Sequence, residues 1–191
     1  MIPYKSDTIV LKDLYDYDRQ EYSLVIPEYQ RSYLWKKENF EKLIDSLLEN
    51  FSNLSTIPSK TFFLGAVIFS KSKYSDNRTL KPFDVVDGQQ RITSLCLLMI
   101  SLYKEICYQH TRFQHNEDTD TYEINWVSNE VSTILELIQK FLFVQERVNA
   151  NLGVIELFMP RIIRQNDKRD KEIRNQRYDS SISQVLNQFK K

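Results

Sequence analysis

A short apolar strand that passes into a long apolar helix through one glycine most constrains this chain. A strand is predicted over residues 83–86, followed by Asp87 and Gly88, and a helix over residues 89–108. The chain has only three glycines, and Gly88 is the one at this turn. Glycine lets the backbone turn sharply and lets a ligand approach the main chain. The sequence therefore predicts a strand–turn–helix unit with an accessible main chain at Gly88.

The remaining pattern of apolar residues predicts a mixture of helices and strands. Residues 36–51 carry apolar side chains at helical spacing with charges on the other face, and residues 126–143 are also predicted to be helical. Residues 62–69 form a continuous apolar run, which predicts a buried strand. The other predicted strands are 8–11, 22–26 (stopped by Pro27), 154–158 and 161–164, and further helical segments are predicted at 12–20 and 167–191.

This order of elements predicts an α+β fold with a small mixed sheet and packed helices. The helix 89–108 is apolar nearly all round, so it is predicted to be central. We expect a core over residues 1–110, followed by a mostly helical C-terminal part over residues 111–191.

The first turn of the helix 89–108 is a candidate anion site. Helix N-termini have unpaired N–H groups and the positive end of the helix dipole, and Arg91 adds a permanent charge suited to phosphate. The alternative is simple capping, because Asp87 followed three positions later by Gln90 is a capping-box pattern. Asp87 is also a candidate for holding Mg²⁺ that bridges phosphates.

A second candidate block lies between the strand 22–26 and the helix 36–51. It holds Tyr29, Gln30, Arg31 and Trp35 in a short turn. Aromatic rings stack on bases, and arginine contacts phosphate. The alternative for Trp35 is packing against the start of the following helix.

The overall charge and the cysteines limit the class of protein. Basic and acidic residues balance at 26 each, although residues 161–177 hold seven basic against three acidic residues, a solvated face or a phosphate-facing patch. No apolar run is long enough to span a membrane, and no signal peptide is evident. Cys96 and Cys107 lie eleven positions apart in one predicted helix, roughly 16 Å, which favours reduced thiols in the cytoplasm.

Two long motifs together resemble the GmrSD-type N-terminal domain, a family related to the ParB and sulfiredoxin-like fold. They are Ile26-Pro27-x-Tyr29-Gln30-Arg31-x-Tyr33-x-Trp35 and Val85-Val86-Asp87-Gly88-Gln89-Gln90-Arg91-Ile92-Thr93-Ser94-Leu95. Between them, Leu43-Ile44-Asp45-Ser46 and Phe63-Leu64-Gly65 also fit, which makes Trp35, Asp45 and Gly65 candidate supporting residues. The stretch 160–171 is similar to a weaker third block.

The resemblance implies binding and hydrolysis of a nucleoside triphosphate with Mg²⁺, in restriction of modified phage DNA. It implies that the turn Gly88–Arg91 receives the phosphates, and that Tyr29, Gln30 and Arg31 line the same pocket. Thr93 and Ser94 are expected to donate hydroxyl groups, and Gln89 or Gln90 to orient the attacking water. Many members carry a C-terminal nuclease domain, which this chain lacks, so we expect a fragment or a stand-alone domain.

Two alternative functions remain open from the sequence. The first is a nucleotide- or DNA-binding switch without turnover. The second is a domain that nicks DNA through the same pocket.

Overall fold

Strands and helices follow one another irregularly along the chain, which makes the fold α+β, as predicted. The computed structural model describes residues 22–54, 63–71, 81–115, 121–150, 153–164 and 184–185. In these ranges the elements are β1 (Tyr22–Ile26), α2 (Lys37–Leu54), β2 (Ile68–Lys71), β3 (Lys81–Asp87), α3 (Gln89–Gln114), α4 (Thr121–Leu142), β4 (Phe143–Ala150), β5 (Gly153–Pro160) and β6 (Ile162–Arg164).

A mixed four-stranded sheet with the order β2-β3-β1-β6 forms the base of the fold. β1 pairs in parallel with both β3 and β6, whereas β2 is antiparallel to β3. β6, which lies in the C-terminal part expected from the sequence, is thus a strand of the same sheet as β1. A separate antiparallel hairpin consists of β4 and β5.

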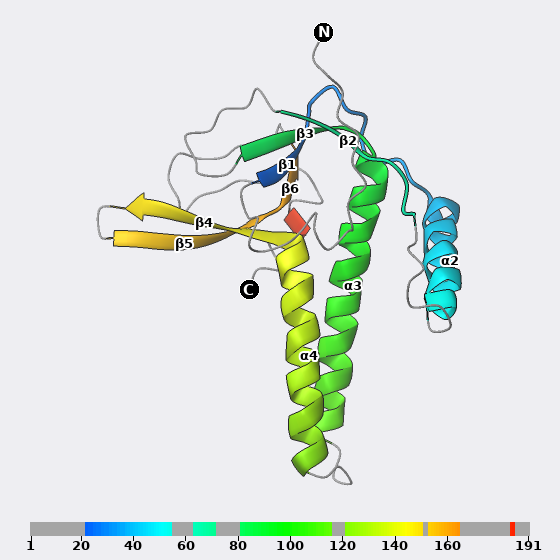
Figure 1. The fold of residues 1–191 in the computed structure, drawn as a ribbon, viewed down its shortest axis with the longest axis vertical. Helices are drawn as coiled ribbons and strands as arrows, with labels where there is room; N and C mark the ends of the chain where they lie inside the picture. Colours follow the sequence, from blue (N-terminus) through cyan, green and yellow to red (C-terminus); the bar gives the residue numbers. More distant parts are fainter. Residues whose placement is uncertain are drawn as a thin grey trace.

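Helices α3 and α4 form a long antiparallel hairpin that runs away from the sheet (Figure 1). Hydrogen bonds join the two helices at His110 Nε2 with Ser128 Oγ (2.9 Å) and from Gln139 Nε2 to the Tyr103 hydroxyl (3.1 Å). In Figure 1, α2 lies on the opposite side of α3 from α4.

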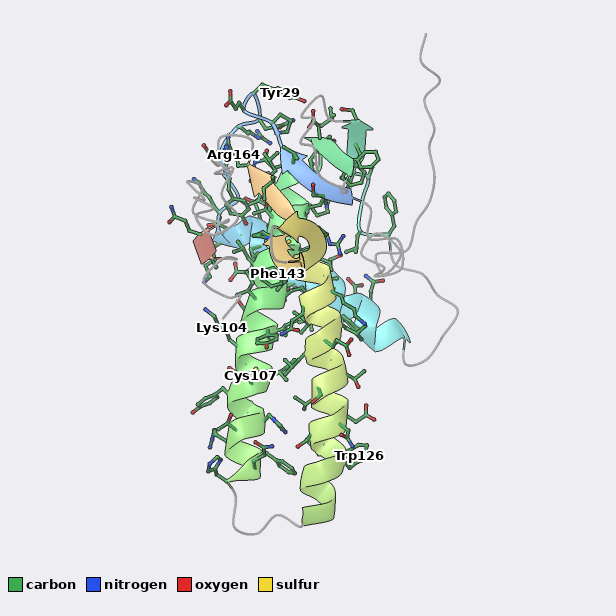
Figure 2. The ribbon with its side chains drawn as sticks, turned by 90° about the vertical axis from the view of Figure 1, so that its left-hand side faces the viewer. Tyr29, Lys104, Cys107, Trp126, Phe143 and Arg164 are labelled. Carbon is green, nitrogen blue, oxygen red and sulfur yellow. The ribbon has the colours of Figure 1, made fainter. Side chains whose placement is uncertain are left out.

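The apolar core lies where the helical hairpin meets the sheet. Its buried members come from β1, β3 and β6, from α2, from the first half of α3, from the end of α4 and from the start of β4, and include Leu24, Leu43, Val85, Leu95, Leu142, Phe143 and Ile162. The distal half of the hairpin is more exposed, as Trp126 in Figure 2 illustrates. The fold therefore places its rigid, well-packed part around the start of α3.

The prediction of one buried strand over residues 62–69 is wrong for its first half. Only Ile68–Lys71 pairs as a strand, and Phe63 is 76% exposed. Gly65 has a φ of 102°, which is incompatible with an extended β-strand, and residues 63–67 form an irregular segment.

Two further predictions need correction. The helix predicted to end at Tyr108 continues to Gln114, and it is central only in its first half, because its buried residues lie between Gln89 and Ile100. The strand β4 was not predicted. The pair that separates β4 from β5, Asn151 and Leu152, is not one of the two-residue sequences typical of hairpin turns, so the sequence carried no clear signal for it.

The other predicted elements agree with the structure where it describes them. The strands 22–26, 83–86, 154–158 and 161–164 and the helices 36–51 and 126–143 are confirmed, with ends that shift by a few residues. The segments predicted at 8–11 and 12–20, and the tail 167–191 apart from residues 184–185, lie outside the described residues. Within the described ranges, every helix is too short or too polar to cross a bilayer.

Candidate functional site

The carboxyl ends of β1, β3 and β6 meet at one edge of the sheet, because the three strands are parallel. The loop 27–36 leaves β1 there, and α3 leaves β3 through Gly88. Ligands of open α/β sheets bind outside the carboxyl ends of the strands. Most of the sequence-predicted site residues therefore come together at this edge.

Gly88 starts α3 with a left-handed backbone, φ 88° and ψ 4°. A Cβ at Gly88 would lie 3.0 Å from both methyl groups of Val67, so position 88 is also tightly packed. The Asp87 carboxylate accepts a hydrogen bond from the Gly88 N–H (2.8 Å), and no side chain caps the helix. The capping-box interpretation is therefore wrong: Gly88 occupies the N-cap position, and the Gln90 side chain is engaged elsewhere.

Gln90 and Gln89 hold the main chain of the loop 27–36. The buried Gln90 side chain accepts hydrogen bonds at Oε1 from the backbone N–H groups of Leu34 (2.8 Å) and Trp35 (3.2 Å). Its Nε2 donates to the Ser32 carbonyl (3.1 Å), and Gln89 Nε2 donates to the Arg31 carbonyl (2.9 Å). We call this set of four bonds the glutamine clasp. It fixes a loop that is more than fifty residues away along the chain.

Two further contacts join the same loop to β3 and α3. Gln30 Nε2 donates to the carbonyl of Val86 at the end of β3 (2.7 Å). The Tyr33 hydroxyl lies 2.8 Å from Ser94 Oγ, and Ser94 Oγ donates to the Gln90 carbonyl. Because a serine hydroxyl has one proton, Tyr33 is the donor to Ser94.

Arg91 lies against the irregular segment 63–67. Its Nη1 donates to the Ala66 carbonyl (3.3 Å), and a Cβ at Gly65 would lie 2.5 Å from that nitrogen. Gly65 therefore leaves the space that the Arg91 guanidinium occupies. A side chain at position 65 would meet that guanidinium.

Tyr29 and Arg31 are exposed on the loop, on either side of Gln30. The Tyr29 side chain is 72% exposed, and Figure 2 shows it at the end of the molecule opposite Trp126. Arg31 is held through its carbonyl, while its side chain is exposed. Both side chains are thus presented to solvent by a loop whose main chain is fixed.

The remaining predicted site residues occupy different surroundings. Thr93 and Ser94 are buried, and Thr93 Oγ1 has no hydrogen-bond partner among the described residues. Trp35 packs against the apolar core. Asp45 is exposed on α2.

Two arginines of the basic run 161–177 have defined places that sequence reasoning missed. Arg161 is 2% exposed, and its guanidinium donates to the carbonyls of Lys140, in the last turn of α4, and Phe143, the first residue of β4. Arg164 Nη2 donates to the Gln30 carbonyl (2.7 Å), which brings it to the candidate site (Figure 2). The solvated-face interpretation is therefore wrong for Arg161; residues 165–177 lie outside the described residues.

The available metal ligands at the site are few. No group of three or more histidine, cysteine or acidic side chains gathers within the described part of the chain. The exposed carboxylate of Asp87 stands at the start of α3. One or two protein carboxylates together with substrate phosphates are a common arrangement for Mg²⁺, so Asp87 fits that use.

Comparison with known proteins matches this chain to a family model and to a curated relative. A family model described as the N-terminal domain of GmrSD restriction endonuclease matches residues 11–191. An uncharacterized protein of Methanocaldococcus jannaschii is 37% identical over 93 residues, which cover 44% of this chain and 16% of that protein. The chain thus aligns with less than a fifth of the length of this curated relative.

Proposed function

The chain belongs to the family of GmrSD restriction endonuclease N-terminal domains, and we propose that it binds and hydrolyses a nucleoside triphosphate at the start of α3. In the proposal this reaction serves a restriction or phage-defence protein that acts on DNA, including modified phage DNA, together with a nuclease domain. The small share of the curated relative that the chain covers is consistent with such further domains.

The uncapped start of α3 beside Arg91 carries the proposal. The first N–H groups of a helix have no partner within the helix, and no side chain caps those of α3. The helix dipole adds positive potential there, and a guanidinium forms charge-assisted bonds with phosphate. A simple capped turn would not leave this anion-binding geometry.

The other residues are assigned roles according to their surroundings. Arg91 and Arg31 contact phosphates, and Tyr29 stacks on the base. Asp87 would hold Mg²⁺, which neutralises phosphate charge when bound. Gln89 and Gln90 are committed to the glutamine clasp, so we assign them to positioning of the loop; orienting water, the role expected from the resemblance, would require those bonds to break. Thr93 and Ser94 support the start of α3 from the buried side.

A switch that binds without turnover is the second candidate. The engagement of both glutamine amides favours it, because each amide already has a partner in the loop. Measuring phosphate release separates the two candidates directly.

The test is binding of GTP, ATP and CTP with Mg²⁺, with phosphate release followed in the same samples. Loss of a charge-assisted phosphate contact in Arg91→Ala is expected to weaken binding about ten- to a hundredfold. Arg112→Ala is the matched control, because Arg112 lies in the last turn of α3 over the Tyr108 ring, far from Gly88. Equal binding by both variants, or no binding by the unsubstituted chain, would contradict the proposal.

A further inference from the structure

Gln30, which follows β1 in the chain, forms hydrogen bonds with residues of both strands that flank β1 in the sheet, β3 and β6. Its carbonyl accepts a 2.7 Å bond from Arg164 Nη2, at the end of β6, and its side chain donates a 2.7 Å bond to Val86, near the end of β3. Its own N–H donates to the Pro27 carbonyl (3.0 Å), which closes the turn after β1. Gln30 therefore links the ends of the three parallel strands.

The position of Arg164 follows from the register of β6. Arg164 is aligned with Ile26, the last residue of β1, so its side chain starts beside the first residue of the loop 27–36. Just before this three-residue strand, the Arg161 carbonyl accepts a bond from the Leu24 N–H, and the Arg161 N–H donates to the Leu142 carbonyl. β6 is thus anchored to β1 and to the end of α4 before it reaches the site.

We propose that Arg164 is a positioning residue of the nucleotide site, which holds Gln30 so that Tyr29 and Arg31 face the nucleotide. This inference rests on the proposed function. A guanidinium bound to a carbonyl forms a charge-assisted hydrogen bond, stronger than a neutral one. Because Tyr29 and Arg31 flank Gln30, fixing its carbonyl reduces the freedom that a ligand would otherwise have to remove from both.

The glutamine clasp and Arg164 hold successive parts of one loop. The carbonyls of residues 30, 31 and 32 accept bonds from Arg164, Gln89 and Gln90, respectively. Two of these donors come from α3, and the third comes from a strand about seventy residues later. The loop is thus held jointly by the start of α3 and by the end of β6.

Amide hydrogen exchange tests the positioning directly and needs no ligand. In Arg164→Gln, the amides of residues 30–35 are expected to exchange about tenfold faster or more. Arg164→Lys keeps a charged donor and is expected to restore part of the protection. Arg112→Gln removes the same charge at the distal end of α3, and the amides of α2 provide an internal reference.

Binding of GTP with Mg²⁺ to the same variants tests the consequence. Arg164→Gln is expected to bind about ten- to a hundredfold more weakly, with Arg164→Lys between it and the unsubstituted chain. Unchanged amide exchange at residues 30–35 in Arg164→Gln would overturn the positioning role. Faster exchange with unchanged nucleotide affinity would show that this positioning does not contribute to nucleotide binding. If the unsubstituted chain binds no GTP, ATP or CTP, the proposed function fails, while the exchange result still decides whether Arg164 positions the loop.

Discussion

The guanidinium of Arg91 occupies the space in which a side chain at Gly65 would begin. An added Cβ would lie 2.5 Å from Arg91 Nη1 and 2.6 Å from Cζ, and the backbone of Gly65 has a φ of 102°. A substitution of Gly65 is therefore expected to lower the stability of the fold in two ways, through a steric clash with Arg91 and through an unfavourable backbone conformation.

Gly65→Ala is expected to destabilise the fold by about 1–3 kcal/mol, because alanine disfavours the left-handed region and its methyl group displaces Arg91. Arg91→Ala removes only the steric part. The cost of Gly65→Ala should thus be smaller in the Arg91→Ala background, as measured by urea denaturation of all four members of the cycle. Strictly additive free energies would show that the guanidinium does not occupy this space in solution.

Local patterns in the sequence predicted the parts of the fold that depend on neighbouring residues. The strand before Asp87, the turn at Gly88 and the helix after it follow from apolar spacing and one glycine. The glutamine clasp depends instead on partners 55–58 residues apart, which no local pattern reveals. The capping-box prediction was wrong for the same reason. The Gln90 side chain forms hydrogen bonds with the loop 27–36, which is distant in the sequence, rather than with the start of its own helix.

Arg164 illustrates a second limit. In the sequence alone, a basic residue after two isoleucines is equally compatible with a solvated strand end and with a site residue. Only the parallel register between β6 and β1, which aligns Arg164 with Ile26, decides between them.

Gln90→Ala is expected to destabilise the fold by about 2–4 kcal/mol, since three hydrogen bonds to the loop are lost around a buried side chain. Trp126→Phe leaves Trp35 as the single tryptophan, so its emission reports on the loop. A shift to longer wavelength is expected in the Gln90→Ala variant. Gln109→Ala is the control, because Gln109 is exposed and donates its side-chain hydrogen bond to Glu105, one turn earlier on the same helix; equal stability of the two variants would contradict the clasp.

Burial raises the pKa of the Cys96 thiol to about 12 from an ordinary value of 9.0, and the positive charge of Arg161 opposes that rise. Above about pH 9 the unfolded chain loses this proton while the folded chain keeps it, so stability falls as the pH rises. The expected slope from this group is about 1.4 kcal/mol per pH unit. Urea denaturation between about pH 8 and pH 10 should show a steeper decline for the unsubstituted chain than for Cys96→Ala; parallel curves would mean that Cys96 ionises equally in both states.

Tyr29→Ala is expected to weaken binding of GTP, ATP and CTP with Mg²⁺ by about five- to a hundredfold, because stacking on a base contributes about 1–3 kcal/mol. The ring is 72% exposed, so the free energy of unfolding should change by less than about 0.5 kcal/mol. Tyr29→Phe keeps the ring and is expected to bind as the unsubstituted chain does. Tyr108→Ala removes another exposed ring, distant on α3, and serves as the control.

The comparison of Tyr29→Ala with Tyr29→Phe separates stacking from a hydrogen bond made by the hydroxyl. Loss in both variants would assign the contribution to the hydroxyl, and loss in neither would exclude Tyr29 from the nucleotide site. A similar loss for all three nucleotides would indicate a stacking contact that does not discriminate bases, since every base presents a π-face. Selectivity for one base would then have to arise from hydrogen bonds to its edge.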